Sequence, residues 1–402
     1  MSRLAVLILV GSILWLAGCG GGIAPSNTAN DPPAAPADNV ATITVGGGPA
    51  GLVNGLFTTV TVCSPGSTSN CATVGGILVD TGSYGLRIMS EVLPAGFSLS
   101  PQTDSNGHPI AECAVFADGF SWGPMVTADI TIAGEKASAT GVQIINGNFA
   151  SIPRACSSGG GTEEDTVATF GANGVLGVGN FAQDCGPACT VNNAYNPGMY
   201  YSCPASGCVV TAEPLAQQVT NPVAFFATDN NGVIVQLPAV TSSSGEVSAT
   251  GSLVFGIGTQ ANNSLGSATV FTLDADGNFT TTFLGNSLPG SFVDSGSTFL
   301  FFPDSNLKAC GTGFDSYYCP SSTVNLSATN QGLNGNRTTI NFSVANAANL
   351  PAQNMVFNDV AAPLPSTLYG FDWGVPFFFG RSVFVAIEGS STPGGTGPYV
   401  AY

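Results

Sequence analysis

The chain carries the stretch Ile77-Leu78-Val79-Asp80-Thr81-Gly82-Ser83, in which an aspartate and a glycine turn directly follow an apolar strand. A close copy, Phe292-Val293-Asp294-Ser295-Gly296-Ser297, stands in the second half of the chain. A single Asp-Gly turn is common, but two copies separated by enough residues for a full domain indicate a duplicated fold. We therefore expect two lobes that each carry one copy and bring the two aspartates face to face.

Paired carboxyl groups define the chemistry that this repeat predicts. Two such groups about 3 Å apart cannot both ionise, so Asp80 and Asp294 are expected to share one proton. One member can then activate a water molecule as a base, while the other donates a proton to a carbonyl oxygen. Glycine after each aspartate allows a sharp turn, and neighbouring hydroxyls can hold the turns and orient the carboxylates. The residues expected to support the pair are Thr81, Gly82, Ser83, Ser295, Gly296 and Ser297.

Together these motifs resemble those of the pepsin-like aspartic peptidases, and the resemblance runs from about residue 52 onward. Segments at 173–179 and 371–378 are similar to those that pass beside the aspartate turns in that family. The resemblance implies an all-β, bilobal pepsin-like fold with a central cleft and few short helices. It places an N-terminal lobe at 42–222 and a C-terminal lobe at 223–402. The chain also resembles an uncharacterised family of bacterial lipoproteins that carry the motifs DTGSYGLR and PFFFGR.

The substrate flap departs from the sequence that is usual in the peptidase family. The resemblance aligns Phe116 with the flap position that usually holds a tyrosine, and Arg87 with the position of its tryptophan partner. Asp118 and Gly119 complete the expected flap and substrate-binding turn. Because phenylalanine cannot make the hydrogen bond of a tyrosine, we expect flap closure and specificity to differ from those of the family.

The first residues of the chain have the pattern of a lipoprotein export signal. Arg3 is followed by an apolar core at 4–16, which is too short to span a membrane as a helix. The sequence Leu16-Ala17-Gly18-Cys19 at the end of this core resembles a lipobox. An ordinary signal peptide with an incidental cysteine is the alternative interpretation.

This pattern predicts how the mature protein begins. We expect a signal peptide at 1–18, a lipidated Cys19 and a flexible tether at 19–41 that is rich in Gly, Pro, Ala and Asn. Gly20 resembles the sorting signal of outer-membrane lipoproteins, which predicts an exported bacterial lipoprotein of the outer membrane. The pattern does not indicate whether the protein faces the periplasm or the cell surface.

Acidic residues outnumber basic ones, with 24 Asp and Glu against 7 Lys and Arg, for a net charge of −17. This charge disfavours nucleic acid and anionic lipid as partners, so we expect membrane contact only through the N-terminal lipid. Work at low pH, where fewer carboxylates are ionised, is one interpretation of the charge. A sparsely charged secreted surface is the other. We expect a monomer whose partner is a peptide or unfolded protein substrate.

The composition favours strands over helices. The chain has 53 glycines, together with many Thr, Ser, Val and Phe residues and several Asn-Gly and Asp-Gly turns. Alternation of apolar and polar residues predicts half-buried strands at 56–62 and 128–132. Short helices are expected at 214–219 and 305–309. The sequence therefore predicts an all-β protein.

Ten of the 11 cysteines follow Cys19 in a chain that is expected to be exported, so disulfides are predicted. Cys63 is expected to pair with Cys71 across a hairpin turn, and Cys310 with Cys319 across a short loop. The four cysteines of the 185–208 group allow three pairings, and a metal site there is the alternative, although no histidine is near. The cysteines whose pairing stays open are Cys113, Cys156, Cys185, Cys189, Cys203 and Cys208.

Two further signals are better explained by loops. The stretch Val45-Gly46-Gly47-Gly48-Pro49-Ala50-Gly51 matches a dinucleotide-binding fingerprint. That site needs a helix at its last glycine and an acidic residue about 20 positions on, whereas strand-like residues follow here and the next acidic residue is Asp80. His108, the only histidine, stands next to Pro109 and is expected in a solvated turn, which disfavours a histidine metal site.

The leading functional hypothesis is an envelope-anchored aspartic endopeptidase that is favoured at acidic pH and cleaves extended peptides bound across the cleft. Since the aspartate pair activates the water, we expect neither a metal nor another cofactor. The second hypothesis is a catalytically inactive pepsin-like lipoprotein that binds a peptide or a glycan in its cleft. A third, weaker one is a structural envelope protein. Cleavage of a denatured protein at acidic pH would separate the first two.

Overall fold

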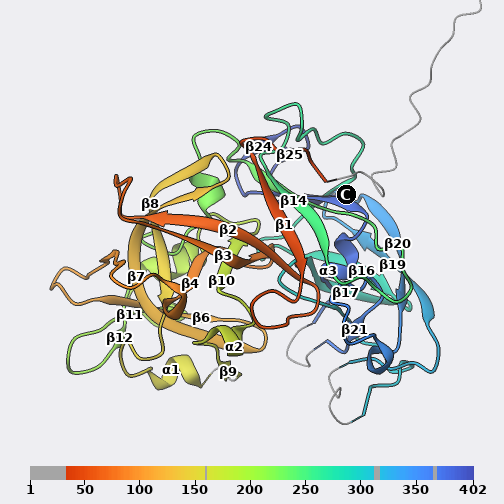
Figure 1. Ribbon diagram of the computed structural model, residues 1–402, viewed down its shortest axis with the longest axis horizontal. Coiled ribbons are helices and arrows are strands. Elements are labelled where there is room, and N and C mark those ends of the chain that lie inside the picture. The colour runs from red at the N-terminus through yellow and green to blue at the C-terminus, as the bar shows by residue number, and fades with distance from the viewer. Residues whose placement is uncertain (1–32, 159–160, 312–316, 365–368) are drawn as a thin grey trace, which may run out of the picture.

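The computed structural model describes residues 33–158, 161–311, 317–364 and 369–402. Within these ranges the chain is mostly β, which confirms the all-β prediction, and its α-helices are three short ones. Figure 1 shows β2, β3, β7 and β8 on one side of the molecule and β16, β19 and β20 on the other, with β1 and β14 between them. The helices are α1 (Arg154–Ser157), α2 (Val167–Phe170) and α3 (Val375–Phe378).

One extended set of hydrogen-bonded strands contains most of the first half of the chain. The hairpin of β2 and β3 leads into Asp80, and β4 returns beside β10. The strands that build this region are β1 (Val40–Gly46), β2 (Gly55–Cys63), β3 (Cys71–Asp80), β4 (Tyr84–Met89), β5 (Ser100–Pro101), β6 (Ile110–Val115), β7 (Gly119–Ile132), β8 (Glu135–Ile145), β9 (Thr162–Glu163), β10 (Gly174–Val178), β11 (Tyr200–Ser202) and β12 (Val209–Val210).

The same set continues into the second half, because β1 pairs with both β2 and β14. It then includes β13 (Gly232–Leu237), β14 (Ala249–Phe255), β15 (Val270–Thr272), β23 (Arg381–Ala386) and β26 (Tyr399–Ala401). A separate seven-stranded sheet supplies Asp294. It consists of β16 (Phe279–Phe283), β17 (Asn286–Val293), β18 (Leu300–Phe301), β19 (Val324–Gln331), β20 (Arg337–Val344), β21 (Ala361–Ala362) and β22 (Asp372–Trp373).

Short elements complete the described chain. They are the small hairpin of β24 (Ser391–Thr392) and β25 (Gly395–Thr396), and the 3-10 helices η2 (Ser90–Val92), η3 (Gly186–Thr190), η4 (Pro222–Phe225) and η5 (Ala347–Asn349).

The core changes character between the two halves. Valine, isoleucine and leucine side chains from alternating strand positions fill the first half. Beneath the second aspartate the core is aromatic, and Phe371 stacks on Trp373 with ring centroids 4.0 Å apart and on Phe302 at 4.8 Å. Stacked and edge-to-face rings fix their neighbours in position more strictly than aliphatic contacts do. The strand that carries Asp372 and Trp373 is therefore held firmly beside Asp294.

The predicted strands are confirmed, because 56–62 lies in β2 and 128–132 lies in β7. The two predicted helices are wrong, since both segments are turns. At 214–219 a single turn is closed by the Gln217 N–H bonded to the Pro214 carbonyl, after which Val219 forms a bridge with Gly141. The glycine-rich segment at 45–51 forms the end of β1 and the turn that leads to β2.

The folded part of the chain begins before the end of the expected tether. The backbone N–H of Ala34 donates to Gln236 Oε1 at 3.0 Å, and Asn39 Nδ2 donates to the Phe255 carbonyl at 3.0 Å. These two hydrogen bonds hold residues 33–41 against β13 and β14. They also give partners to polar groups that the packing covers. The expected signal peptide, Cys19 and the tether up to residue 32 lie outside the described residues. No helix among the described residues is long and apolar enough to cross a membrane.

Five disulfides connect ten cysteines. Cys63–Cys71 and Cys310–Cys319 are confirmed as predicted. Within the 185–208 group each cysteine pairs with the one nearest to it along the chain, and a metal site there is contradicted because all four thiols form disulfides. Disulfides are typical of proteins that fold outside the cytosol. The pairs in that group are Cys113–Cys156, Cys185–Cys189 and Cys203–Cys208.

Candidate active site

Equivalent strand arrangements position the two aspartates. Asp80 is the last residue of β3, and β10 runs parallel to β3 with Gly177 opposite Asp80. Asp294 follows β17, and β22 runs parallel to β17 with Trp373 opposite Val293. The Asp294 N–H donates to the Trp373 carbonyl at 3.1 Å. Each turn therefore passes beside one of the segments, 173–179 or 371–378, that the resemblance singled out.

Four crossed hydrogen bonds join the two turns. The Thr81 N–H donates to Ser295 Oγ at 3.1 Å, and the Ser295 N–H donates to Thr81 Oγ1 at 2.9 Å. Each hydroxyl then donates into the opposite strand, Thr81 to the Val293 carbonyl at 3.3 Å and Ser295 to the Val79 carbonyl at 2.8 Å. Both hydroxyl residues are buried. The two turns form one hydrogen-bonded unit although they lie far apart in the sequence.

Both carboxylates have the same local partners. Asp80 accepts the Gly82 N–H at 2.7 Å on Oδ1 and the Ser83 hydroxyl at 2.5 Å on Oδ2. Asp294 accepts the Gly296 N–H at 2.7 Å on Oδ1 and the Ser297 hydroxyl at 3.0 Å on Oδ2. The backbone and hydroxyl donors hold each carboxyl group in one orientation.

The glycines bring the carboxyl groups of opposite turns close together. A Cβ atom on Gly82 would stand 2.6 Å from Asp294 Cγ, and one on Gly296 would stand 2.7 Å from Asp80 Cγ. Any side chain at either position would displace the facing carboxyl group. Glycine is required here because of this close approach, since neither residue has a positive φ. The structure thus brings together all eight residues that the sequence assigned to the aspartate pair and its support.

The electrostatics of the pair favour a shared proton. Desolvation by the surrounding protein, the negative charge of Asp80 and a side-chain hydrogen bond with Asp80 raise the pKa of Asp294 well above its usual value. Burial and the charges of both aspartates also raise the pKa of the neighbouring Tyr84 phenol. Two carboxyl groups that interact in this way lose their protons in separate steps. One proton is therefore retained on the pair over the pH range between those steps.

The expected flap is the hairpin of β6 and β7, in which Val115 pairs with Phe120. Its turn is closed by the Phe116 N–H, which donates to the Gly119 carbonyl at 2.8 Å. The Phe116 ring makes an edge contact with Phe170 at 5.6 Å between centroids. Asp118, at the tip of the turn, is exposed.

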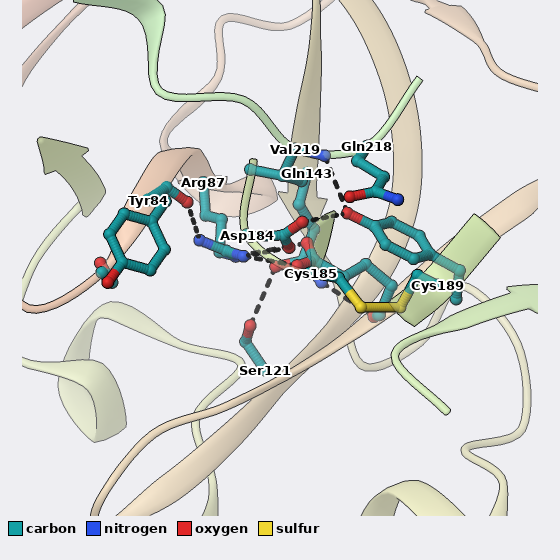
Figure 2. Close-up of polar contacts among 12 residues, drawn as sticks. Tyr84, Arg87, Ser121, Gln143, Asp184, Cys185, Cys189, Gln218 and Val219 are labelled. Carbon is teal, nitrogen blue, oxygen red and sulfur yellow. Dashed lines mark hydrogen bonds and ion pairs between the residues drawn. A yellow bond between two sulfur atoms is a disulfide. The ribbon is translucent and has the colours of Figure 1, made fainter. Parts of the chain in front are cut away.

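Arg87 lies beneath this hairpin in a buried network of charges (Figure 2). Its Nη2 atom lies 2.5 Å from Glu112 Oε1 and 2.9 Å from Asp184 Oδ2. Asp184 also accepts the Tyr200 hydroxyl at 2.6 Å. Burial and the charge of Glu112 raise the pKa of Asp184 well above its usual value, against the opposing effect of Arg87. One guanidinium thus serves two buried carboxyl groups.

Arg87 also connects the flap to the aspartate pair. Its Nη1 atom donates to the carbonyl of Tyr84, the residue that follows the first aspartate turn, and its guanidinium lies 6.0 Å from the centre of the Phe116 ring. The two departures from the family sequence therefore contact each other. Replacing Arg87 with the family tryptophan would leave Glu112 and Asp184 buried without a cation, which is strongly destabilising. The hairpin that the resemblance assigns to the flap is therefore packed on an arginine.

Sequence reasoning missed two parts of this site. Glu112 interrupts the apolar run Ile110–Val115, and a lone charge at a buried strand position is a signal for a buried ion pair. Asp372 lies in the segment 371–378, which passes beside the second aspartate turn. The equivalent position in the segment 173–179, beside the first turn, is the apolar Val175, and this difference is visible when the two copies of the repeat are aligned.

His108 lies in the expected turn, 3.1 Å from Asp104, with its side chain 40% exposed.

A comparison with protein-family models gives one match, to the family described as "Protein of unknown function (DUF3443)", over residues 35–402. The match begins directly after Ala34, whose N–H donates to Gln236 of β13. It includes both aspartate turns, the flap hairpin and all five disulfides. No curated protein matches the chain.

Proposed function

The chain belongs to this DUF3443 family, and we propose that it is an aspartic endopeptidase with a pepsin-like bilobal fold. The observation that carries the proposal is the pair of crossed turns, which holds Asp80 and Asp294 against each other with their carboxyl groups oriented by equivalent donors. A structural role alone does not require two buried acids to face each other, since such a pair destabilises the fold. The predicted lobes at 42–222 and 223–402 and their cleft belong to this proposal.

The proposed mechanism needs only the pair and a water molecule. With one proton on the pair, the ionised member removes a proton from the water as it attacks the peptide carbonyl. The protonated member donates to the carbonyl oxygen, so that charge does not accumulate on the tetrahedral intermediate. The pair then donates a proton to the departing amine and takes one from a hydroxyl group of the intermediate, so that the C=O bond of the new carboxylic acid forms as the C–N bond breaks. The pair ends the cycle with the same number of protons that it had at the start.

Acidic pH favours this cycle. The activity requires one proton on the pair, and the factors that raise the pKa of Asp294 keep that proton in place as the pH approaches neutral. A net charge of −17 also fits an environment in which carboxylates are partly protonated. The proposed substrate is an extended peptide or an unfolded protein bound beside the Phe116–Gly119 turn by a monomeric enzyme.

The test uses the purified mature chain with a denatured protein as substrate, from strongly acidic to neutral pH. We expect a bell-shaped pH profile, loss of cleavage in both Asp80→Asn and Asp294→Asn, and wild-type activity in Asp276→Asn, which removes an exposed carboxylate. A statine-like transition-state analogue should inhibit the wild type. Absence of cleavage by the wild type at every pH, with the fold intact, contradicts the proposal.

The alternative proposal is an inactive pepsin-like protein that binds a peptide or a glycan. One observation favours it, namely that Phe116 offers no hydroxyl at the flap position and is instead fixed against Phe170 and Arg87. A ligand that binds equally well to the wild type and to Asp294→Asn, without turnover, would support this alternative.

We also propose that the chain is anchored to the outer membrane through lipid on Cys19. The five disulfides indicate an exported protein, and the lipobox-like sequence before Cys19 supports the anchor. Replacement of Cys19 by serine should release the processed chain from the membrane fraction and remove the mass of the lipid. Continued membrane association of an unlipidated, processed chain contradicts the anchor.

A further inference from the structure

A third carboxyl group, that of Asp372, lies next to the aspartate pair. Asp372 is 5% exposed and stands on β22, which runs parallel to the strand that leads into Asp294. The Ser297 hydroxyl oxygen lies 2.6 Å from Asp372 Oδ2 and 3.0 Å from Asp294 Oδ2. One hydroxyl group therefore connects the two carboxyl groups.

Counting protons restricts the state of this group. The Ser297 hydroxyl has one proton, so it can donate to only one of the two carboxyl groups, and an ionised carboxylate can only accept. For both contacts to be hydrogen bonds, either Asp372 or Asp294 must be protonated and donate to Ser297 Oγ. Two ionised groups on one hydroxyl would leave one short oxygen–oxygen contact without a proton.

The partner of the second carboxyl oxygen decides which of the two is the acid. Asp294 Oδ1 accepts the Gly296 N–H at 2.7 Å. Asp372 Oδ1 is buried and has no hydrogen-bond partner among the residues that the structure describes. Negative charge on a buried, unpaired oxygen is far more costly than a neutral carbonyl oxygen at the same place. Burial, together with the charge of Asp80, accordingly raises the pKa of Asp372 well above its usual value, although the Ser297 contact opposes this shift.

The first turn has no such group. Beside the second aspartate turn, Asp372 pairs with Phe292. At the equivalent position beside the first turn, Val175 pairs with Leu78. Ser83 therefore donates to Asp80 without a competing carboxyl group in that position. The two members of the pair differ in this one respect.

We propose that Asp372 is a third carboxyl group of the site that stays protonated at neutral pH, donates to Ser297 and so directs the Ser297 hydroxyl toward Asp294. In this role Asp372 is a positioning residue. It keeps the Ser297 hydroxyl as a donor to Asp294, so that the Asp294 carboxyl group holds one orientation relative to Asp80. The positioning role in catalysis rests on the proposed function, whereas the protonation of Asp372 does not.

Few other titratable groups face the hydrogen bonds that join Asp372, Ser297 and Asp294. Asp80 lies across the pair and Tyr84 lies beside it on β4, where its raised pKa keeps the phenol neutral. The neighbouring strands β17 and β18 and helix α3 contribute no acidic or basic side chain. A change in the protonation of Asp372 can therefore be separated from that of its neighbours.

Infrared difference spectroscopy at neutral pH reads this proton without any need for turnover. Protonated carboxyl groups have a carbonyl stretch that carboxylates lack. Asp372→Asn should lose one such band relative to the wild type, whereas the exposed control Asp276→Asn should lose only carboxylate signal. Loss of only carboxylate signal in Asp372→Asn overturns the proposal. Where Asp372→Asn does not fold, Ser297→Ala should shift the band because the acid loses its acceptor, and an unshifted spectrum overturns the proposal.

A kinetic measurement then tests the role in catalysis. Asp372→Asn replaces one neutral donor with a weaker one, so kcat should fall several-fold while the alkaline limb of the pH profile stays at its wild-type position. If Asp372 were ionised, the variant would remove a negative charge beside Asp294, and the limb would move to lower pH, which contradicts the proposal. A wild type that shows the band but cleaves nothing refutes the peptidase and leaves the third acid in place.

Discussion

Replacing Thr81 with valine removes one hydroxyl from the crossed turns and keeps the shape of the side chain. In the wild type this hydroxyl accepts from the Ser295 N–H at 2.9 Å and donates to the Val293 carbonyl at 3.3 Å. Both turns are buried at this point, with Thr81 4% and Ser295 0% exposed. Water therefore cannot replace the lost partner without opening the contact between the turns.

The size of the effect follows from these two contacts. A buried polar group that loses its hydrogen-bond partner costs about 1–3 kcal/mol. The Ser295 N–H loses a short, well-formed bond, whereas the contact to the Val293 carbonyl is long and contributes less. We expect Thr81→Val to lower the free energy of unfolding by about 2–4 kcal/mol. Thr81→Ser keeps the hydroxyl and should retain most of the stability.

The assay is urea unfolding of the disulfide-intact chain, followed by intrinsic fluorescence, with ΔΔG taken from the shift in midpoint. The matched control is Thr73→Val, which removes a hydroxyl from the exposed Thr61–Thr73 pair at 2.8 Å and should change stability by less than about 0.5 kcal/mol. The double variant Thr81→Val with Ser295→Ala should show a coupling of about 0.5–3 kcal/mol, since each residue supplies both a donor and an acceptor to the other.

Equal stability of Thr81→Val and Thr73→Val would refute this reasoning. It would mean that the crossed hydrogen bonds do not hold the two turns together, and the alignment of the aspartates would need another cause. A loss of stability in Thr81→Ser as large as that in Thr81→Val would have the same consequence, because the hydroxyl would then not be the group that matters.

Two other predictions address the site directly. Gly296→Ala places a Cβ 2.7 Å from Asp80 Cγ and should abolish hydrolysis. Gly311→Ala, where an added Cβ would meet no atom of the described residues within 4 Å, should keep wild-type activity, and equal activity of the two would contradict the close approach. Burial of Glu164, together with the charge and hydrogen bond of Asp118, raises the pKa of Glu164 from 4.5 to about 8. Between these two values the native state holds a proton that the unfolded chain releases. The wild type should therefore lose stability as the pH rises from 4.5 to about 8. Glu164→Gln should flatten this part of the Tm-versus-pH curve, and unchanged slopes would refute the assignment.

Features written in neighbouring residues could be predicted from the sequence. The Asp-Gly turn after an apolar strand is a local conformation, and its repetition predicted both aspartates together with the hydroxyls that join the turns. The disulfides Cys63–Cys71 and Cys310–Cys319 close short loops and were predicted for the same reason. The all-β class follows from composition and alternation, which act over a few residues at a time.

The helices expected at 214–219 and 305–309 show where local propensity fails. Each segment makes a single turn, and its last residue forms a β-bridge, Val219 with Gly141 of β8 and Ala309 with Tyr318 across the loop that Cys310–Cys319 closes. Nucleating a helix costs more than one turn can recover, so tertiary pairing prevails in so short a segment.

Only the tertiary structure decided which distant polar groups meet. Arg87 contacts Asp184 across 97 positions of sequence, and Ser297 contacts Asp372 across 75. No local pattern encodes such a pair, because partners on different strands are selected by sheet register and by the cost of leaving a charge buried alone. The sequence by itself thus determined the two catalytic candidates, while the packed sheets determined the third acid and the buried arginine that surround them.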